Sequence, residues 1–373
     1  MSGSIYGTLF RISTWGESHG KGLGVVIDGC PAGLTLTEDM IQEYLNRRRP
    51  GQTKYSTPRK EADTVEILSG TFGNKTTGTP ISLAVMNTNQ RSGDYSEIAE
   101  YYRPGHADYA YDSKYGFRDY RGGGRSSGRE TIGRVAGGAV AKAILTQLGI
   151  KVYAYTKSIG PVTIDYKNSR EENITASPLV MPDLKASARA EALLEEQMER
   201  KDSLGGIIEC IVSGMPVGIG EPVIEKLDAN LAKAILSVGA VKGIEFGSGF
   251  QAALMSGSEN NDSFQCDAGG KVSKLTNHAG GILGGMSDGS DIVFRAAVKP
   301  TPSIAKTQAT VNKSGENIKV NIKGRHDPII VPRAVVVVEA MTAITLVDML
   351  FMNLTSRMDN IVQFYNPHSD REN

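Results

Sequence analysis

The order of hydrophobic and polar residues predicts a chain of mixed strands and helices. Between residues 8 and 28, a loose apolar and polar alternation gives way to an apolar run, which predicts two strands joined by GESHGKGLG. Further strands are expected at IIECIVSG, VKGIEF, DIVFRAAV and IKVNIK. The first turn is unusual because it carries Glu17, Ser18 and His19. Loops that present such side chains are frequent sites of function.

The first expected helix has both of its ends marked. Thr37 can cap its start, acidic residues follow in the first turn, and three arginines precede Pro50 at its end. Its apolar face is expected to be Met40, Ile41, Tyr44 and Leu45. Similar spacing predicts helices over residues 130–148, 183–200 and 222–238.

The longest apolar stretch, residues 334–352, contains Glu339 and Asp348. A charged residue is costly at the centre of a bilayer, so this stretch is interpreted as a buried helix and no membrane association is expected. Strands and helices are mixed without strict alternation, and no repeat or linker divides the chain. We therefore expect an α+β fold in one large domain over residues 1–361. The polar segments 255–274 and 362–373 are expected to be mobile.

Composition narrows the class of protein. The 373 residues are 40% hydrophobic and 22% charged, which is ordinary for a globular protein. Lys plus Arg equals Asp plus Glu, 41 against 41, so the overall charge gives no reason to expect nucleic-acid or membrane binding. Three separated cysteines and the absence of an apolar N-terminal run predict a cytoplasmic location. No spacing is typical of a zinc site, and no metal is expected.

Histidine and arginine are concentrated in a few short segments. Four of the five histidines lie in GESHG, RPGHAD, NHAGG and GRHDP, where packing does not explain them. Six arginines fall between Arg103 and Arg134, and RGGGRSSGRE comes directly before an expected helix. Backbone N–H groups, serine hydroxyls and guanidinium groups can converge there on an anion, so a phosphate or polycarboxylate ligand is predicted. A disordered RNA-binding segment is the alternative, but such segments are long and repetitive.

A dinucleotide site was considered because GSGFQA matches G-x-G-x-x-A after an expected strand. No helical pattern follows it, and no acidic residue appears at the required distance. A Rossmann fold is therefore not expected.

Seven segments, in this order, resemble the signature segments of the chorismate synthase family: TWGESHG, RRRPG, RPGHADY, YRGGGRSSGRET, NHAGGILGG, KPTPS and GRHDP. The resemblance extends from Gly7 to about Met352. It implies an anti 1,4-elimination of phosphate from 5-enolpyruvylshikimate 3-phosphate, giving chorismate. The family reaction requires reduced flavin mononucleotide (FMN) without net redox change. One phosphate and two carboxylates on the substrate would account for the arginines.

The resemblance also implies roles for particular residues. His19 would protonate the leaving phosphate, since imidazole titrates near neutral pH. His106 would stand beside the flavin, where a cationic imidazole could stabilise the reduced ring. Asp327 would assist proton removal through the flavin, and Ser18 and Ser127 are candidate hydroxyl relays.

Binding residues follow from the same resemblance. The implied flavin contacts are Arg125, Ser126, Ser127, Gly239, Ala240, Gly284, Lys299, Pro300, Thr301, Pro302, Ser303 and Arg325. The implied substrate anchors are Arg48, Lys54, Arg59, Arg134 and Arg333. Two positions depart from the common pattern: Lys54 stands where Arg is usual, and Gly239 stands where Asn is usual. The first exchanges a planar fork for a point charge.

The family fold implies a β-α-β sandwich, with helices between two antiparallel sheets, assembled as a homotetramer. NADPH would act only indirectly, as the source of electrons for an external flavin reductase. Two other readings stay open from the residues alone. One is an FMN-dependent oxidoreductase or flavin reductase acting on a phosphorylated carboxylate, and the other is a phosphate-ligand or RNA-binding protein without chemistry.

Overall fold

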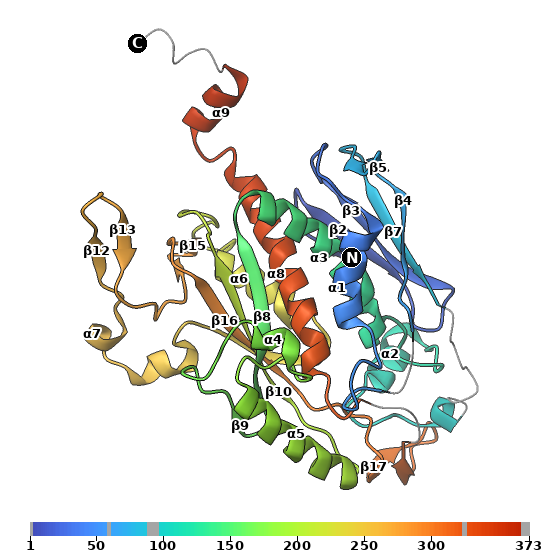
Figure 1. Cartoon of the computed structure of the whole chain (residues 1–373). Coiled ribbons are helices and arrows are strands. Elements are labelled where there is room, and N and C mark those ends of the chain that lie inside the picture. Colours follow the sequence, from blue (N-terminus) through green and yellow to red (C-terminus); the bar gives the residue numbers. More distant parts are fainter. Residues whose placement is uncertain (1–2, 58–60, 88–96, 323–326, 367–373) are drawn as a thin grey trace.

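Two five-stranded antiparallel sheets form the frame of the molecule in the computed structural model (Figure 1). The structure describes residues 3–57, 61–87, 97–322 and 327–366. The first sheet has the order β1 (Ile5–Tyr6), β2 (Arg11–Gly16), β3 (Gly22–Asp28), β7 (Ile81–Met86) and β4 (Val65–Ser69). The second has the order β11 (Val241–Phe246), β16 (Ile292–Val298), β10 (Gly206–Ser213), β8 (Lys151–Ile159) and β9 (Val162–Thr163).

Four two-stranded hairpins extend from this frame. They are β5 (Thr71–Phe72) with β6 (Lys75–Thr76), β12 (Phe264–Cys266) with β13 (Val272–Lys274), β14 (Ile282–Leu283) with β15 (Met286–Ser287), and β17 (Thr307–Val311) with β18 (Asn317–Asn321). Every strand predicted from the sequence is present. The combination of antiparallel sheets and separate helices confirms the expected α+β class.

The described helices are α1 (Glu38–Arg48), α2 (Asp108–Tyr115), α3 (Thr131–Gln147), α4 (Asn173–Ala176), α5 (Leu184–Glu199), α6 (Leu227–Leu236), α7 (Gly257–Asn260), α8 (Val331–Asn353) and α9 (Met358–Tyr365). Helix α3 packs on β2, β3 and β7 of the first sheet, and α8 packs on β8 and β10 of the second. The two helices also pack on each other. Thr37 caps α1 by accepting from Met40 N, as predicted.

One expectation about where a helix begins was wrong, and one segment expected to be mobile contains regular elements. The helix predicted over residues 222–238 begins only at Leu227, because Val223 has a φ of +72° and Lys226 is extended. Residues 255–274 contain α7 and a hairpin, where mobility was expected. The end of this segment is fixed by Lys274, which is buried between Asp262 and Asp288. The predicted tail over residues 362–373 overlaps the end of α9, and its last seven residues lie outside the described part.

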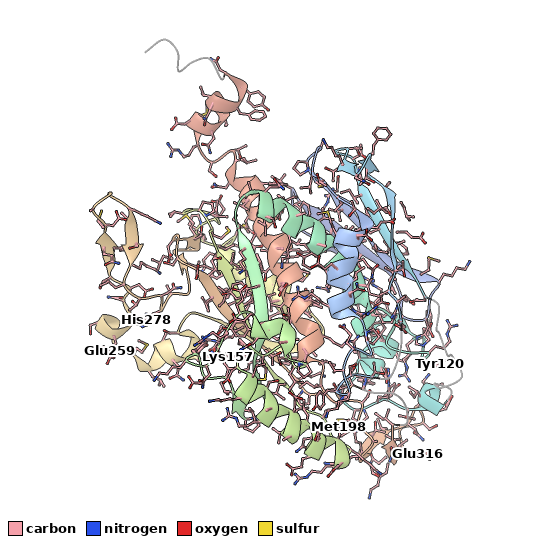
Figure 2. All side chains as sticks on the ribbon, in the orientation of Figure 1. Tyr120, Lys157, Met198, Glu259, His278 and Glu316 are labelled. Atoms are coloured by element: carbon pink, nitrogen blue, oxygen red, sulfur yellow. The ribbon has the colours of Figure 1, made fainter. Side chains whose placement is uncertain are left out.

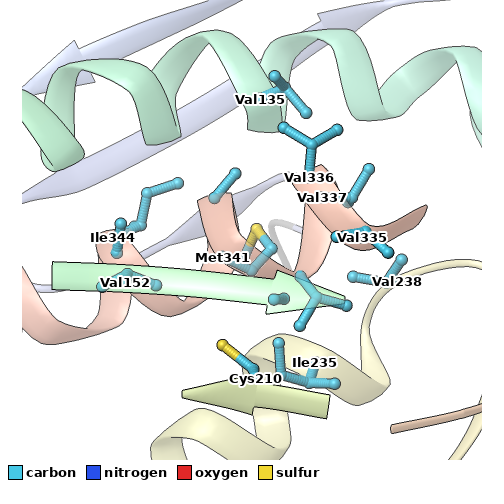
Figure 3. Close-up of a cluster of buried hydrophobic side chains, with 14 of the residues drawn as sticks. Val135, Val152, Cys210, Ile235, Val238, Val335, Val336, Val337, Met341 and Ile344 are labelled. Atoms are coloured by element: carbon cyan, nitrogen blue, oxygen red, sulfur yellow. The ribbon is translucent and has the colours of Figure 1, made fainter. Parts of the chain in front are cut away.

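Helix α8 crosses the core and is the helix predicted over residues 334–352. It is long and apolar enough to span a membrane by composition, but 83% of its apolar window is buried inside the protein. Figure 3 shows Val336 and Met341 of α8 among side chains of α3, β8, β10 and α6. A Cβ at Gly138 would lie 2.3 Å from Ala340 Cβ, so this glycine allows α3 and α8 to approach closely.

Candidate active site

The turn between β2 and β3 holds the first two candidate catalytic side chains. Gly20 N donates to Glu17 O (3.2 Å), and Ser18 Oγ lies 3.1 Å from His19 Nδ1. Gly122 covers this pair, because a Cβ at that position would lie 2.6 Å from Nδ1 and Cε1 of His19. The turn and the glycine-rich segment therefore meet around His19.

His106 lies on the loop before α2 and is hydrogen-bonded through both ring nitrogens. Nδ1 lies 3.0 Å from Pro104 O, so it carries the proton, and Nε2 accepts from the Ser303 hydroxyl at 2.9 Å. Burial, followed by the positive charge of Arg103, lowers the pKa of His106 to about 4. This lowered pKa favours the neutral imidazole near pH 7 in the absence of a ligand, and the cationic form expected beside the reduced flavin stays a prediction.

The segment of residues 299–303 follows β16 and lies against the His106 loop. Lys299 Nζ donates to Gly105 O (2.9 Å), and a Cβ at Gly105 would lie 2.7 Å from Pro302 Cβ. Thr301 Oγ1 is buried and has no hydrogen-bond partner within the described residues. Ala240 adjoins the same segment, since its carbonyl accepts from Lys299 N (2.9 Å).

The glycine-rich segment forms two short 3-10 helices, Gly124–Ser126 and Gly128–Glu130, directly before α3. Ser126 is exposed and donates to Gly123 O, and Ser127 Oγ caps the second turn by accepting from Arg129 N. Arg125 does not point into an open anion site. It donates to Gly16 O, Ser4 Oγ and both oxygens of Thr14.

Arg48 is buried within a network of protein groups. It donates to Thr131 Oγ1 (3.1 Å), Asp63 Oδ2 (2.9 Å) and Gly128 O (2.9 Å), and its side chain is only 3% exposed. Asp63 also accepts from Arg129 Nη2 (3.2 Å). Burial, then the charge of Arg333, lowers the pKa of Arg48 to about 10. In this structure Arg48 joins α1 to the start of α3.

Asp327 precedes α8 and has two partners. Its Oδ1 accepts from Thr57 N (2.7 Å), and its Oδ2 accepts from Arg333 Nη1 (2.8 Å). Arg333 Nε donates to Arg48 O (3.1 Å), so Asp327 is connected to the Arg48 network. Arg59, Arg325 and His326, all singled out in the sequence, lie outside the described residues.

These groups form one continuous set of contacts. Arg103 lies on the same loop as His106, and its Nη2 lies 3.5 Å from Gly122 O. Gly122 in turn lies against His19. On the other side, the His19 turn contacts Asn87, Asn87 contacts Arg129, and Arg129 contacts Asp63. Asp63 contacts Arg48, Arg48 contacts Arg333, and Arg333 contacts Asp327. Segments distant in the sequence therefore meet around two histidines and several guanidinium groups.

Three candidate residues lie apart from this set. Lys54 is exposed and pairs with Glu195, while Arg134 donates to Glu130 and Ser237. Gly284 is in the β14–β15 turn beside Gly285, whose carbonyl accepts from Leu227 N at the start of α6. Ala240 follows the C-terminal end of α6, which has ten residues and is therefore about 15 Å long. Gly284 and Ala240 thus lie near opposite ends of this helix. Gly239 is exposed beside Ala240.

His278, the remaining loop histidine, is also remote. Its Nδ1 lies 3.2 Å from Asn260 O. Figure 2 shows it beside Glu259, on the opposite side of the molecule from Tyr120. In the part of the chain that the structure describes, His278 therefore has no contact with the network around His19 and His106.

Sequence reasoning missed two residues of the network, Asp63 and Asn87. Asp63 is 1% exposed at its side chain and has a φ of +48°. Asn87 follows β7 and contacts both the His19 turn and Arg129. Each is a single polar residue at the end of a loop or strand. Only the position of Asp63 between arginine-rich segments offered a signal.

Comparison with known proteins identifies the family. The family model described as chorismate synthase matches residues 10–351. A chorismate synthase of Lachnoclostridium phytofermentans is 70% identical over 365 residues, covering 98% of this chain and 100% of that protein. One of Methanosarcina mazei is 54% identical over 351 residues, covering 93% and 96%. A crystal structure of chorismate synthase superimposes with a TM-score of 0.77 at 32% identity, covering 98% of this chain and 99% of the other. The chain belongs to the chorismate synthase family of lyases.

Proposed function

We propose that this chain converts 5-enolpyruvylshikimate 3-phosphate to chorismate by anti 1,4-elimination of phosphate. The observation that supports this most strongly is the single contact network joining His19, His106 and the arginine-rich segments. An elimination of this kind needs a proton donor at the leaving phosphate, cations that hold the substrate and a group that removes the C–H proton. The network offers a candidate for each need.

His19 is the proposed acid at the leaving phosphate. The imidazole lies in a glycine-rich turn, and the adjacent Ser18 hydroxyl can relay or orient its proton. Pro104 O and the Ser303 hydroxyl hold the His106 ring at both nitrogens, so the imidazole has a fixed position from which it can face the proposed flavin. Asp327 is held by Thr57 and Arg333 in a fixed orientation and is the proposed proton acceptor.

Among the proposed substrate anchors, Arg333 is best placed. It is partly exposed and donates through Nε and Nη1, and its Nη2 has no partner among the described residues. Arg48 has protein partners at all three nitrogens, so its contribution is to support the anchors. Lys54, Arg59 and Arg134 stay proposals from the resemblance.

The residues present fit a flavin. Among the described residues, the buried Thr301 hydroxyl has no hydrogen-bond partner beside Ser303 and His106, and a Cβ at Gly124 or Gly239 would meet no atom within 4 Å. We propose that residues 299–303, Ala240, Ser126 and Ser127 hold FMN, with Gly239, Gly284, Arg125 and Arg325 as the other proposed contacts. When bound there, reduced FMN would supply electron density that helps expel phosphate, with no net redox change.

Several wider properties are proposed together with this function. The packing of α3 and α8 on separate sheets and on each other supports the β-α-β sandwich. A homotetramer, a cytoplasmic location and a separate flavin reductase are expected from the family. Neither nucleic acid nor a membrane is an expected partner, given the balanced charge.

Phosphate release tests this function directly. The purified chain is incubated anaerobically with dithionite-reduced FMN and the substrate, and phosphate and chorismate are measured. We expect one phosphate released for each chorismate formed, with flavin needed only in catalytic amount. With oxidised FMN in place of reduced FMN, no phosphate should be released. The oxidoreductase alternative would instead consume NAD(P)H in proportion to product. Product formation without reduced flavin, or stoichiometric reductant use, would contradict the proposal.

A further inference from the structure

We propose that Asn87 is a positioning residue for His19. Its carboxamide closes the turn that presents Ser18 and His19, and it fastens this turn to the arginine network. This inference rests on the proposed function, because the role of His19 as an acid belongs to that function.

The location of Asn87 follows from the first sheet. Strand β7 pairs with β3, with Met86 opposite Gly22, so the next residue lies beside the turn that precedes β3. Asn87 N continues the pairing by donating to Lys21 O (3.0 Å). The Asn87 side chain is therefore held beside the carbonyl groups of residues 17–20.

Every polar group of the Asn87 carboxamide has a partner. Nδ2 donates to Glu17 O (3.1 Å) and Gly20 O (2.8 Å), the two carbonyls that begin and end the turn. Oδ1 accepts from Arg129 Nη2 (2.8 Å). This pattern fixes the amide orientation, since only the NH₂ group can face two carbonyl oxygens.

Arg129 carries the connection to the basic groups of the site. Its Nη2 also donates to Asp63 Oδ1 (3.2 Å), and Asp63 Oδ2 accepts from Arg48 Nη1. Asn87 thus sets where the His19 turn lies relative to the residues that connect to Arg333. A proton donor and its anionic substrate must be aligned within a fraction of an ångström. The connection that Asn87 makes between the His19 turn and Arg129 therefore matters for turnover more than for binding.

The Asn87→Asp substitution separates the contacts of Asn87 with the turn from its contact with Arg129. A carboxylate can still accept from Arg129, but it cannot donate to Glu17 O or Gly20 O. The turn should loosen while the link to Arg129 persists. Asn87→Ala removes both links without adding charge, and it serves if the aspartate variant does not fold. Asn173→Asp is the matched control, because Asn173 Nδ2 also donates to a backbone carbonyl, that of Pro182.

Two measurements are made on the full chain. Hydrogen exchange reports the backbone amides of residues 17–21, and anaerobic phosphate release with reduced FMN gives kcat, KM and their pH dependence. We expect faster exchange in the turn, a kcat lower by about ten- to a hundredfold, a KM within a few-fold, and a shift in the pH limb that His19→Ala abolishes. Asn173→Asp should change none of these.

The outcomes separate the inference from the function. Unchanged exchange in both Asn87 variants would overturn the inference, as would faster exchange with wild-type kcat and pH profile. Absence of phosphate release in the wild type would instead refute the proposed function, and the exchange result would still decide whether Asn87 closes the turn.

Discussion

At the scale of single residues, His106 shows how local surroundings set protonation. Its folded pKa is about 4, below the ordinary value of 6.5, because burial and Arg103 oppose the cation. Between these two pH values the unfolded chain binds more protons than the folded protein. This histidine therefore makes the free energy of unfolding fall as pH drops from 6.5 to 4, and it has no such effect above 6.5.

Replacing His106 with Asn should remove this pH dependence. The stability advantage of the wild type over the variant should shrink between pH 6.5 and 4, by about 3 kcal/mol at most. Urea unfolding of both proteins at several pH values in this window measures the difference. A gap that stays constant with pH would show that His106 is not neutral in the folded protein.

Gly122 is the second residue whose role depends on one contact. With a φ of +144° and His19 at 2.6 Å from a built Cβ, an alanine at this position must displace the imidazole. We expect Gly122→Ala to lower kcat about tenfold or more, on the scale of misaligned catalytic groups, with a folded protein. Gly257→Ala is the control, since a Cβ at Gly257 in α7 would meet nothing within 4 Å. Equal activity of the two variants would mean that His19 need not occupy this position.

At the scale of secondary-structure elements, one buried carboxylate joins four of them. Glu339 on α8 accepts from Arg47 of α1, Lys142 of α3 and the backbone of Ala154 in β8. Burial opposes its charge, but Arg47 and Lys142 outweigh this effect and lower the pKa of Glu339. The stability that this carboxylate contributes is therefore present above its ordinary pKa and is lost as pH falls through the lowered value.

Glu339→Gln should destabilise the protein by about 3 kcal/mol or more, because Lys142 keeps a largely buried charge without its partner. Glu43→Gln on the exposed face of α1 is the control and should change stability little. Chemical unfolding at neutral pH measures both. A loss below about 1 kcal/mol for Glu339→Gln would show that the pairs merely offset their desolvation.

Elements with local signals were predictable from the sequence, and long-range ones were not. The cap of α1 and the pairing of β2 with β3 around a glycine-rich turn depend on nearby residues, so their patterns could be recognised. The start of α6 depends on Val223 in a left-handed conformation and on a contact with Gly285, which periodicity does not encode. The end of the 255–274 segment depends on contacts of Lys274 with Asp262 and Asp288, 12 and 14 residues away in the chain, which periodicity does not encode either.

The candidate site divides in the same way. His19 and His106 stood out because glycine-rich or charged loops are poor places for a packing histidine. Asn87 did not stand out, because its partners are a turn about 70 residues earlier and an arginine about 40 residues later in the chain. Arg48 was interpreted as a substrate anchor from the family resemblance, whereas its burial with Asp63 could only be seen in the folded chain.

At the scale of the whole molecule, the arrangement of strands bears on the source of electrons. Neighbouring strands in both five-stranded sheets are antiparallel. A dinucleotide fingerprint requires a parallel strand, a glycine turn and a helix in one crossover unit. The GSGFQA segment leads from β11 into the 3-10 helix Gly249–Leu254. It therefore matches that fingerprint in sequence pattern but not in structure.

We therefore expect that NADPH alone cannot drive this enzyme. In an anaerobic mixture of the chain, oxidised FMN, substrate and NADPH, the flavin should stay oxidised and no phosphate should appear. Adding a separate flavin reductase, or replacing NADPH with dithionite, should start phosphate release from the same sample, which shows that the chain is competent. Flavin absorbance and phosphate are followed together. Bleaching of the flavin by the chain and NADPH alone would place a reductase site within this fold, outside any dinucleotide-binding crossover, and would remove the need for a second protein.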